Sequence, residues 1–258
     1  MKNHVLLISI LALLVATSCA SRKDLIYFQD EPLEEGIATT EPEQLIYKTD
    51  DILTINVSAF DPETVKPFNM YTIANNTEIL RTNSAQQVQT YLVDYDGFID
   101  FPVLGKIKVA GLTRTEVTAL LTERIKEYAN DPIVNVRLVN FTVTVLGEVS
   151  RPGTFTIQDE RVTLLEAIGM ANDLTIFGKR NNVLLIREIN GKKKFAKIDL
   201  TTINAVNSPL YYLQQNDVIY VEPNNARVRS STYNQNNGVL ISAIGTLTTI
   251  IAVFIVNR

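Results

Sequence analysis

Two apolar stretches, one near each end of the printed sequence, constrain this chain more than any other feature. Residues 6–15 form an apolar run behind Lys2, and residues 239–256 form an uncharged, mostly aliphatic run. The polar stretch between them has about 200 residues, which is enough for two small domains. The sequence therefore predicts a body tied to a membrane at both ends, which works at or across that membrane rather than as a free enzyme.

The first apolar stretch has the layout of a lipoprotein signal. A positive residue and a short apolar region are typical of a signal peptide, and the run is shorter than the roughly 20 residues of a membrane-spanning helix. Small residues then lead into Cys19, the only cysteine, although Ala16 stands where such signals usually carry leucine. We predict a lipoprotein signal peptide over 1–18, lipidation of Cys19 with palmitate as a marker, and a lipid-anchored tether over 19–44. The alternative is ordinary secretion with an unmodified cysteine.

Composition argues against several kinds of chemistry. The only histidine, His4, lies inside the predicted signal, and the chain has no tryptophan. A mature chain without histidine or a free thiol cannot build a Ser-His-Asp or Cys-His site or a zinc site on those ligands. The formal net charge of −4 offers no basic stripe for nucleic acid. We therefore expect no catalytic residue, no metal site, no cofactor and no nucleic-acid partner.

The first half of the body alternates strand patterns with one helix pattern. Residues 52–57 have the period of a half-buried strand, and 61–90 are interpreted as a long irregular insertion. Asp96-Gly97 lies between two β-prone stretches and predicts a hairpin. Thr113 and Glu116 have the spacing of a capping box, which predicts a helix ending near Pro132.

The second half repeats this order. Residues 141–145 and 154–157 alternate as strands do, and Thr163 with Glu166 predicts a second capping box and a short helix to about Met170. Asn190-Gly191 predicts another hairpin, and 217–221 predict a closing strand. Helices packed on small sheets indicate an α+β fold with two small β-rich domains, followed by a C-terminal transmembrane helix.

Several segments resemble one family. In the first half these are 47–57, 93–102 and 105–113, and in the second half 145–149, 152–155 and 163–168. Together they are similar to the bacterial outer-membrane polysaccharide export lipoproteins. The resemblance implies a polysaccharide export domain over 45–140 and one soluble ligand-binding β-grasp (SLBB) domain over 141–223. It covers roughly 45–223, with Asn172-Asp173 standing where the family usually has two glycines.

The resemblance also implies a function. Members of the family form ring-shaped homo-oligomers that export capsular or exopolysaccharide, receiving the polymer from an inner-membrane co-polymerase. The expected location is the outer membrane, with a lipid anchor and the body in the periplasm. Outer-membrane lipid is then a partner, and the sequence leaves open whether another outer-membrane protein takes part. A glycan-binding or adhesion lipoprotein without a pore is the alternative, and a carbohydrate-active enzyme is a third.

The second apolar stretch has two unlike faces. A polar linker over 224–238 leads to 239–256, which as a helix is just long enough to span a membrane. Small and hydroxyl side chains suit helix contacts or a lumen, whereas aliphatic ones suit lipid. We assign Ser242, Gly245, Thr246 and Thr249 to the small, polar face and Leu240, Ile244, Leu247, Ile251 and Phe254 to the lipid face. The alternative is a plain tail anchor whose hydroxyls bond to their own helix.

Overall fold

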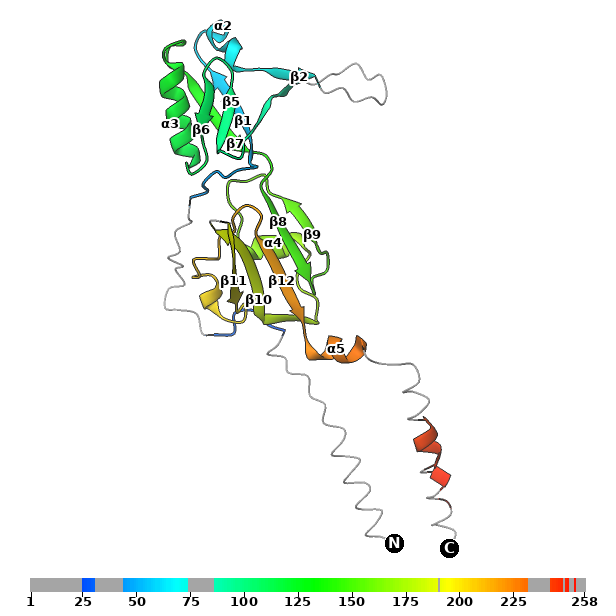
Figure 1. Ribbon diagram of the computed structural model, residues 1–258. Coiled ribbons are helices and arrows are strands. Elements are labelled where there is room, and N and C mark those ends of the chain that lie inside the picture. The colour runs from blue at the N-terminus through cyan, green and yellow to red at the C-terminus, as the bar shows by residue number, and fades with distance from the viewer. Residues whose placement is uncertain are drawn as a thin grey trace.

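The described part of the chain forms two α+β domains, which lie one above the other in Figure 1. A computed structural model describes residues 25–30, 44–73, 86–189, 191–231, 242–247, 249, 250 and 253. The short helix α5 (Asn225–Ser231) leads away from the lower domain on the side opposite to the upper one. Two β-rich domains with a few helices confirm the predicted α+β class.

The upper domain is built on a three-stranded antiparallel sheet with the order β4-β1-β7. Small two-stranded sheets, β2-β3 and β5-β6, accompany it. The strands are β1 (Ile52–Ser58), β2 (Tyr71–Ile73), β3 (Gln86–Val88), β4 (Thr90–Leu92), β5 (Phe98–Phe101), β6 (Gly105–Lys108) and β7 (Ile133–Leu138), and the helices are α2 (Pro62–Val65), the 3₁₀ helix η2 (Lys66–Phe68) and α3 (Arg114–Ile125).

The alternation of apolar residues along β1 explains how the core of this domain forms. Alternate residues of β1 point to opposite faces of the sheet, so that Leu53, Ile55 and Val57 are buried. They share one core with residues of α3, including Leu121 and Ile125. The predicted capping box at the start of α3 is confirmed: the Thr113 side chain accepts from the Glu116 amide and the Glu116 side chain accepts from the Thr113 amide.

The lower domain is one five-stranded sheet with the order β11-β10-β12-β8-β9. Neighbouring strands are antiparallel except for β12 and β8, which are parallel. Its elements are β8 (Thr142–Gly147), β9 (Gly153–Thr156), α4 (Leu164–Met170), β10 (Gly178–Ile189), β11 (Lys192–Ile198), the 3₁₀ helix η3 (Ile203–Ala205) and β12 (Val218–Pro223). The capping box at Thr163 and Glu166 is confirmed, as is the hairpin whose strands β10 and β11 flank residues 190–191.

Gly147 allows the parallel strands to lie close together where β8 ends. Its φ is +91°, and a Cβ atom placed there would lie 2.1 Å from the carbonyl oxygen of Val221 on β12. Only glycine combines this backbone conformation with so close an approach. This glycine therefore fixes the end of the central strand pair.

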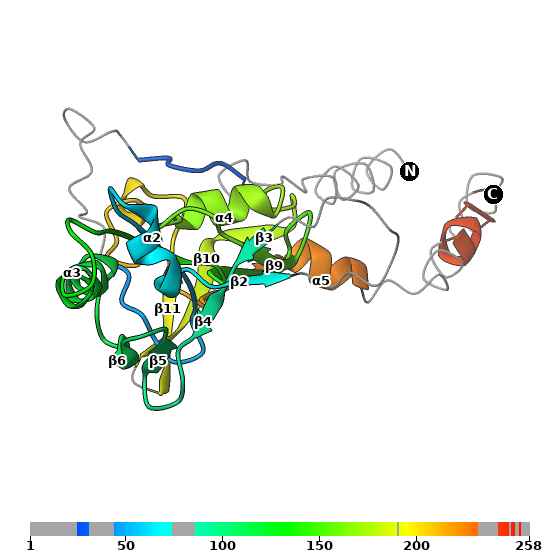
Figure 2. The same cartoon turned by 90° about the horizontal axis from the view of Figure 1, so that it is seen from above.

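Only one face of the five-stranded sheet is covered by a described helix. Helix α4 lies along it (Figure 2) and contributes Leu164, Ala167 and Ile168 to the core. The sheet supplies Val145, Val183, Leu185, Ile219 and Val221 to that core. On the opposite face Phe195 is 65% exposed, Leu146 42% and Tyr220 36%. The uncovered face thus carries large side chains in contact with solvent.

Four expectations for the chain need correction. The stretch 61–90 is not wholly irregular, because it contains α2, η2, β2 and β3. Asp96-Gly97 forms a turn, but β4 and β5 on its two sides belong to different sheets, and the hairpin is β5 with β6. The linker 224–238 contains α5. In the predicted tether, residues 25–30 pack on the lower domain instead of standing apart, since Tyr27 contacts its core.

Candidate functional site

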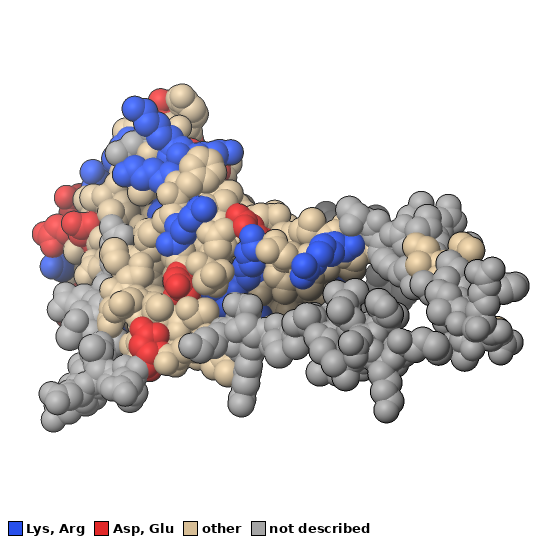
Figure 3. Space-filling view, turned by 90° about the horizontal axis from the view of Figure 1, so that it is seen from below, with Lys and Arg blue, Asp and Glu red and all other residues tan. Residues whose placement is uncertain are grey.

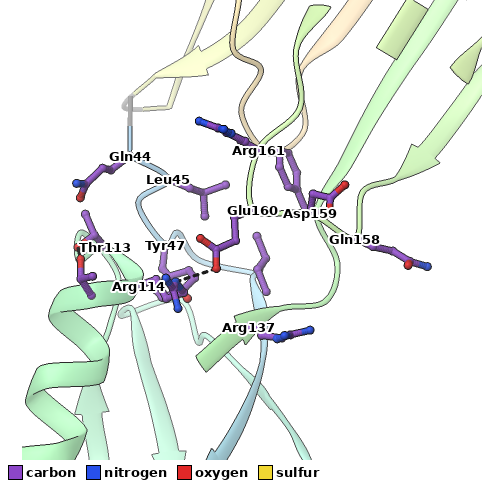
Figure 4. Close-up of a pocket in the computed structure, with 13 residues that line it drawn as sticks. Gln44, Leu45, Tyr47, Thr113, Arg114, Arg137, Gln158, Asp159, Glu160 and Arg161 are labelled. Carbon is purple, nitrogen blue, oxygen red and sulfur yellow. Dashed lines mark hydrogen bonds and ion pairs between the residues drawn. The ribbon is translucent and has the colours of Figure 1, made fainter. Parts of the chain in front are cut away.

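A cavity of about 500 Å³ lies where the two domains meet, and it is lined from both of them. Figure 4 shows Arg114 of the upper domain pointing toward Glu160 of the lower one, in the loop after β9. The lining residues are Gln44, Leu45, Tyr47, Thr113, Arg114, Thr115, Arg137, Leu138, Phe141, Gln158, Asp159, Glu160 and Arg161. Cavities of this size accommodate small ligands, so this junction is the candidate site.

One ion pair crosses the cavity. Arg114 Nε lies 3.0 Å from Glu160 Oε1, and the two side chains are 46% and 70% exposed. Solvent screens charges at such positions, so the pair contributes less than about 1 kcal/mol. A pair of this strength holds the two domains together more loosely than a buried core contact would.

Tyr47 forms the apolar side of the cavity. Its ring is 2% exposed, and burial, the largest effect, raises the pKa of its hydroxyl to about 12. The hydroxyl therefore stays protonated at neutral pH and can donate a hydrogen bond but cannot act as a base. Among the lining residues, all of which are described, there is neither histidine nor cysteine. The polar groups that line the cavity are carboxylates, guanidinium groups, hydroxyls and side-chain amides, which can form hydrogen bonds and ion pairs.

Asn140 connects the domains covalently and by hydrogen bonds. Its side-chain oxygen accepts from the Ile52 amide at 2.8 Å, and its side-chain nitrogen donates to the Asp50 carbonyl at 2.9 Å. Its own carbonyl accepts from Gln215 Nε2 at 2.7 Å, and Gln215 Oε1 accepts from the Thr142 amide at 2.7 Å. One side chain from each domain thus holds the short crossing from β7 to β8.

The segment 25–30 lies on the lower domain as an additional edge. The Phe28 amide donates to the Leu200 carbonyl at 3.2 Å and the Gln29 amide to the Thr201 carbonyl at 2.6 Å. The Tyr27 hydroxyl donates to the Asp173 carboxylate, and its ring lies 5.2 Å from the Arg180 guanidinium. Burial of the ring and the Asp173 carboxylate raise the pKa of Tyr27, so the donor stays protonated.

The predicted site residues are not brought to this junction. Cys19, Leu240, Ile251 and Phe254 lie outside the described residues. Ser242, Ile244, Gly245, Thr246, Leu247 and Thr249 are helical and exposed. In the described part of the chain, no helix combines the length and the apolar character that crossing a membrane requires. The transmembrane helix over 239–256 therefore stays a prediction.

The hydroxyls of the C-terminal helix bond to the helix itself. Thr246 Oγ1 donates to the Ser242 carbonyl at 2.9 Å, and Thr249 Oγ1 donates to the Gly245 carbonyl at 2.5 Å. Bonds to the carbonyl four residues earlier are a common way for helical threonine to satisfy its hydroxyl. This is the pattern expected of the tail-anchor alternative.

Sequence patterns did not point to the junction. Asn140 falls between two alternating strands, at 134–138 and 141–145. Its place at the boundary between the two predicted domains was the one feature of the sequence that could have indicated a role in joining them. Nothing local to Tyr27 indicates its contact with Asp173, since the two residues are 146 positions apart. The tyrosines at 211 and 212, by contrast, pack edge to face with ring centroids 5.6 Å apart, as packing residues do.

Comparison with known proteins matches both domains. Residues 39–139 match the family described as polysaccharide biosynthesis/export protein, and residues 142–221 match the SLBB domain. The chain belongs to the polysaccharide biosynthesis/export family. It is similar to the EPS I polysaccharide export outer membrane protein EpsA of Ralstonia solanacearum, at 32% identity over 74% of this chain and 53% of that protein.

A second export relative gives the same result. EpsA of Ralstonia nicotianae, also described as an EPS I polysaccharide export outer membrane protein, is 33% identical over 67% of this chain and 46% of its own length. The chain spans about half the length of each of these relatives. The upper domain is therefore called the export domain below, and the lower one the SLBB domain.

Proposed function

We propose that this chain is a subunit of an outer-membrane exporter of capsular or exopolysaccharide. The observation that carries the proposal is the order of an export domain followed directly by an SLBB domain, in a chain similar to proteins described as exopolysaccharide exporters of the outer membrane. The candidate cavity is suited to binding a polar ligand, because its lining supplies hydrogen-bonding and charged side chains. No step of the proposal requires a cofactor.

The proposal includes the assembly and its anchorage. Copies of the chain form a ring, Cys19 carries the lipid, the body lies in the periplasm and the C-terminal stretch crosses the outer membrane. An inner-membrane co-polymerase hands the polymer to the ring. The modest interdomain ion pair between Arg114 and Glu160 is consistent with a junction that adjusts while polymer passes.

The primary test is export. Deleting the gene from its host and restoring it should first abolish and then restore extracellular polysaccharide, with polymer retained in the deleted cells. Full-length protein extracted in detergent should form closed rings by electron microscopy. Normal secretion after deletion would contradict the exporter, and a protein that stays monomeric while secretion depends on it would contradict the ring.

The anchorage has its own test. Cys19→Ala should abolish palmitate labelling and leave uncleaved precursor. In the C-terminal stretch, Leu247→Asp and Ile251→Asp should block membrane insertion, whereas Thr246→Ser should not, because serine keeps the hydroxyl. Equal tolerance of all three substitutions would refute the lipid-facing assignment.

One observation favours the alternative, a glycan-binding lipoprotein without a pore. Thr246 and Thr249 use their hydroxyls within their own helix, which is what a helix serving only as an anchor would do. The two functions differ in conductance: full-length protein in a planar bilayer should open a pore if it exports, and should leave the bilayer sealed if it only binds glycan.

A further inference from the structure

The uncovered face of the SLBB sheet carries a row of lysines around an exposed aromatic ring. Lys193, Phe195 and Lys197 alternate along the edge strand β11, so their side chains point to the same face about 7 Å apart. All three are exposed, Phe195 by 65%. Lys192 and Lys194 add charge on the other side of the strand. None of these lysines forms an ion pair within 4.0 Å in the described part of the chain.

Two acidic residues share the face: Glu188 lies opposite Lys193 in the register, and Glu222, which pairs with Lys179, lies near Lys197. With Lys179 counted, the basic residues of this face outnumber the acidic ones by one.

The rest of this face continues the row across the sheet. Cross-strand partners share a face, and the register places Lys197 opposite Leu184, Leu184 opposite Tyr220, and Tyr220 opposite Leu146. The side chains of these four residues span four strands about 5 Å apart. In the view from below, basic side chains are most frequent over the upper part of the molecule, with acidic side chains beside them (Figure 3).

Protection of the sheet edge explains only part of this arrangement. Lysines on an edge strand prevent that strand from pairing with another chain. This protection explains why the lysines are there but not why Phe195 is exposed between them. Phe195 is among the most exposed large apolar side chains, and it raises the risk of edge pairing. Phe195 shares this face with Leu146 and Tyr220, which are 42% and 36% exposed, and a patch of exposed apolar side chains marks an interaction surface.

A protein partner fits the surface poorly. Lysine is depleted at the centres of protein interfaces, because a buried charge without a carboxylate is costly. An extended, hydrated polyanion avoids that cost, since its charges lie along the chain and its rings can lie flat on aromatic side chains. Aromatic rings offer an apolar platform of defined geometry, and Tyr220 adds a hydroxyl for hydrogen bonding.

We infer that the Lys193–Phe195–Lys197 face binds an acidic polysaccharide, one with carboxylate groups along its chain. The lysines pair with the carboxylates, Phe195 stacks on a sugar ring, and Tyr220 holds the polymer farther across the sheet. This inference rests on the proposed function in that it names the class of polymer that is exported. It assigns the polymer to a sheet face away from the interdomain cavity.

The test compares binding of two polymers to full-length protein in detergent. Alginate is the polyuronate probe and dextran the neutral one, and affinity is measured by calorimetry as a function of salt. Alginate should bind at least about tenfold more tightly than dextran at low salt, and the preference should fall as salt rises. Equal affinity for both polymers would overturn the inference.

Matched variants locate the surface. Lys193→Gln with Lys197→Gln should weaken alginate binding about tenfold and flatten its salt dependence, while Phe195→Ser should weaken it about fivefold with the salt dependence kept. The control pair Lys66→Gln with Lys126→Gln removes equal charge from the export domain and should change binding less than twofold. Unchanged unfolding temperatures establish that all variants fold.

The remaining outcomes are distinct from failure of the export proposal. Lysine variants that aggregate but bind alginate normally would overturn the inference in favour of edge protection. Lysine variants that lose their rings but bind alginate normally would overturn it in favour of a protein partner. Loss of extracellular polysaccharide on gene deletion upholds the exporter in either case, because that measurement does not depend on this face.

Discussion

The hydroxyl of Tyr27 donates a hydrogen bond to the carboxylate of Asp173, a residue whose backbone φ of 67° is in the left-handed region. Asn172 before it is also left-handed, with φ of 56°. Glycine adopts this conformation without strain, and it is the residue type that the resemblance noted in the sequence implies at both positions. Asp173 thus adopts a strained backbone conformation at a position where its side chain holds the segment 25–30 by the hydrogen bond from Tyr27.

We expect Asp173→Gly to release that segment without weakening the domain. The variant loses a hydrogen-bond acceptor, worth about 1 kcal/mol, but relieves the left-handed strain. Hydrogen exchange at the Phe28 and Gln29 amides should become about fivefold faster, and the unfolding temperature should not fall. Asp173→Asn is the control, because asparagine keeps an acceptor and tolerates this φ; faster exchange in both variants to the same degree would contradict the assignment.

The Arg114–Glu160 ion pair should contribute little to stability but detectably to domain orientation. In a double-mutant cycle with Arg114→Ala and Glu160→Ala, the coupling energy should be about 0.5 kcal/mol, since both side chains are substantially exposed. Small-angle scattering should show a wider distribution of interdomain distances in either variant. A coupling above about 2 kcal/mol would mean that the junction is rigid, contrary to the screening expected there.

The pair Arg187–Asp217 behaves differently, because it is buried. Arg187 Nη2 lies 2.7 Å from Asp217 Oδ2, and the side chains are 5% and 0% exposed. Asp217→Ala leaves a buried guanidinium without its partner and should destabilise the protein by about 3–5 kcal/mol, measured by urea unfolding. The double variant Arg187→Met with Asp217→Ala removes that charge and should be less destabilised than Asp217→Ala alone; the reverse order would show that the pair is not what stabilises this region.

Asp51 makes stability depend on pH. Burial raises the pKa of its carboxyl from 3.8 to about 6, although the Lys48 amide, which donates to it at 2.8 Å, acts in the opposite direction. Between these two values the folded protein binds a proton that the unfolded chain does not, so this group's contribution to stability falls as pH rises through the window and is lost above about pH 6. Acidic conditions therefore favour the folded state at this position.

The measurement is the free energy of unfolding in urea from about pH 4 to pH 7. Relative to Asp51→Asn, the native protein should lose about 2 kcal/mol across this range, because the asparagine cannot ionise but can still accept from the Lys48 amide. Parallel curves for the two proteins would show that Asp51 does not titrate in this window.

The sequence predicts well those features that depend on residues close together along the chain. Both capping boxes use residues three positions apart, so Thr113 with Glu116 and Thr163 with Glu166 could be recognised before any fold was known. The alternation in 52–57 and 134–138 likewise reports burial directly. The turn at Asp96-Gly97 was recognised, but its pairing was wrong, because which strands pair depends on the closure of the whole sheet.

The junction could not be predicted in the same way. Its cavity collects residues from 44–47, 113–115, 137–141 and 158–161, and each of these segments reads locally as a turn, a cap or a strand end. The contact of residues 25–30 with the SLBB domain was missed for the same reason. Sites assembled from distant segments become visible only once the packing of the domains is known.

The strand order of the SLBB domain has a consequence for how the protein matures. β12, the last strand of the domain in sequence, lies in its middle, between β10 and β8. Until residues 218–223 have emerged, β8 and β10 cannot be joined and the hydrophobic core around Val145 and Ile219 stays open. A chain that emerges in the N-to-C direction must therefore keep this domain unfolded until nearly all of its residues up to Pro223 are available, and the apolar strands β8 and β10 stay unpaired with β12 during that interval.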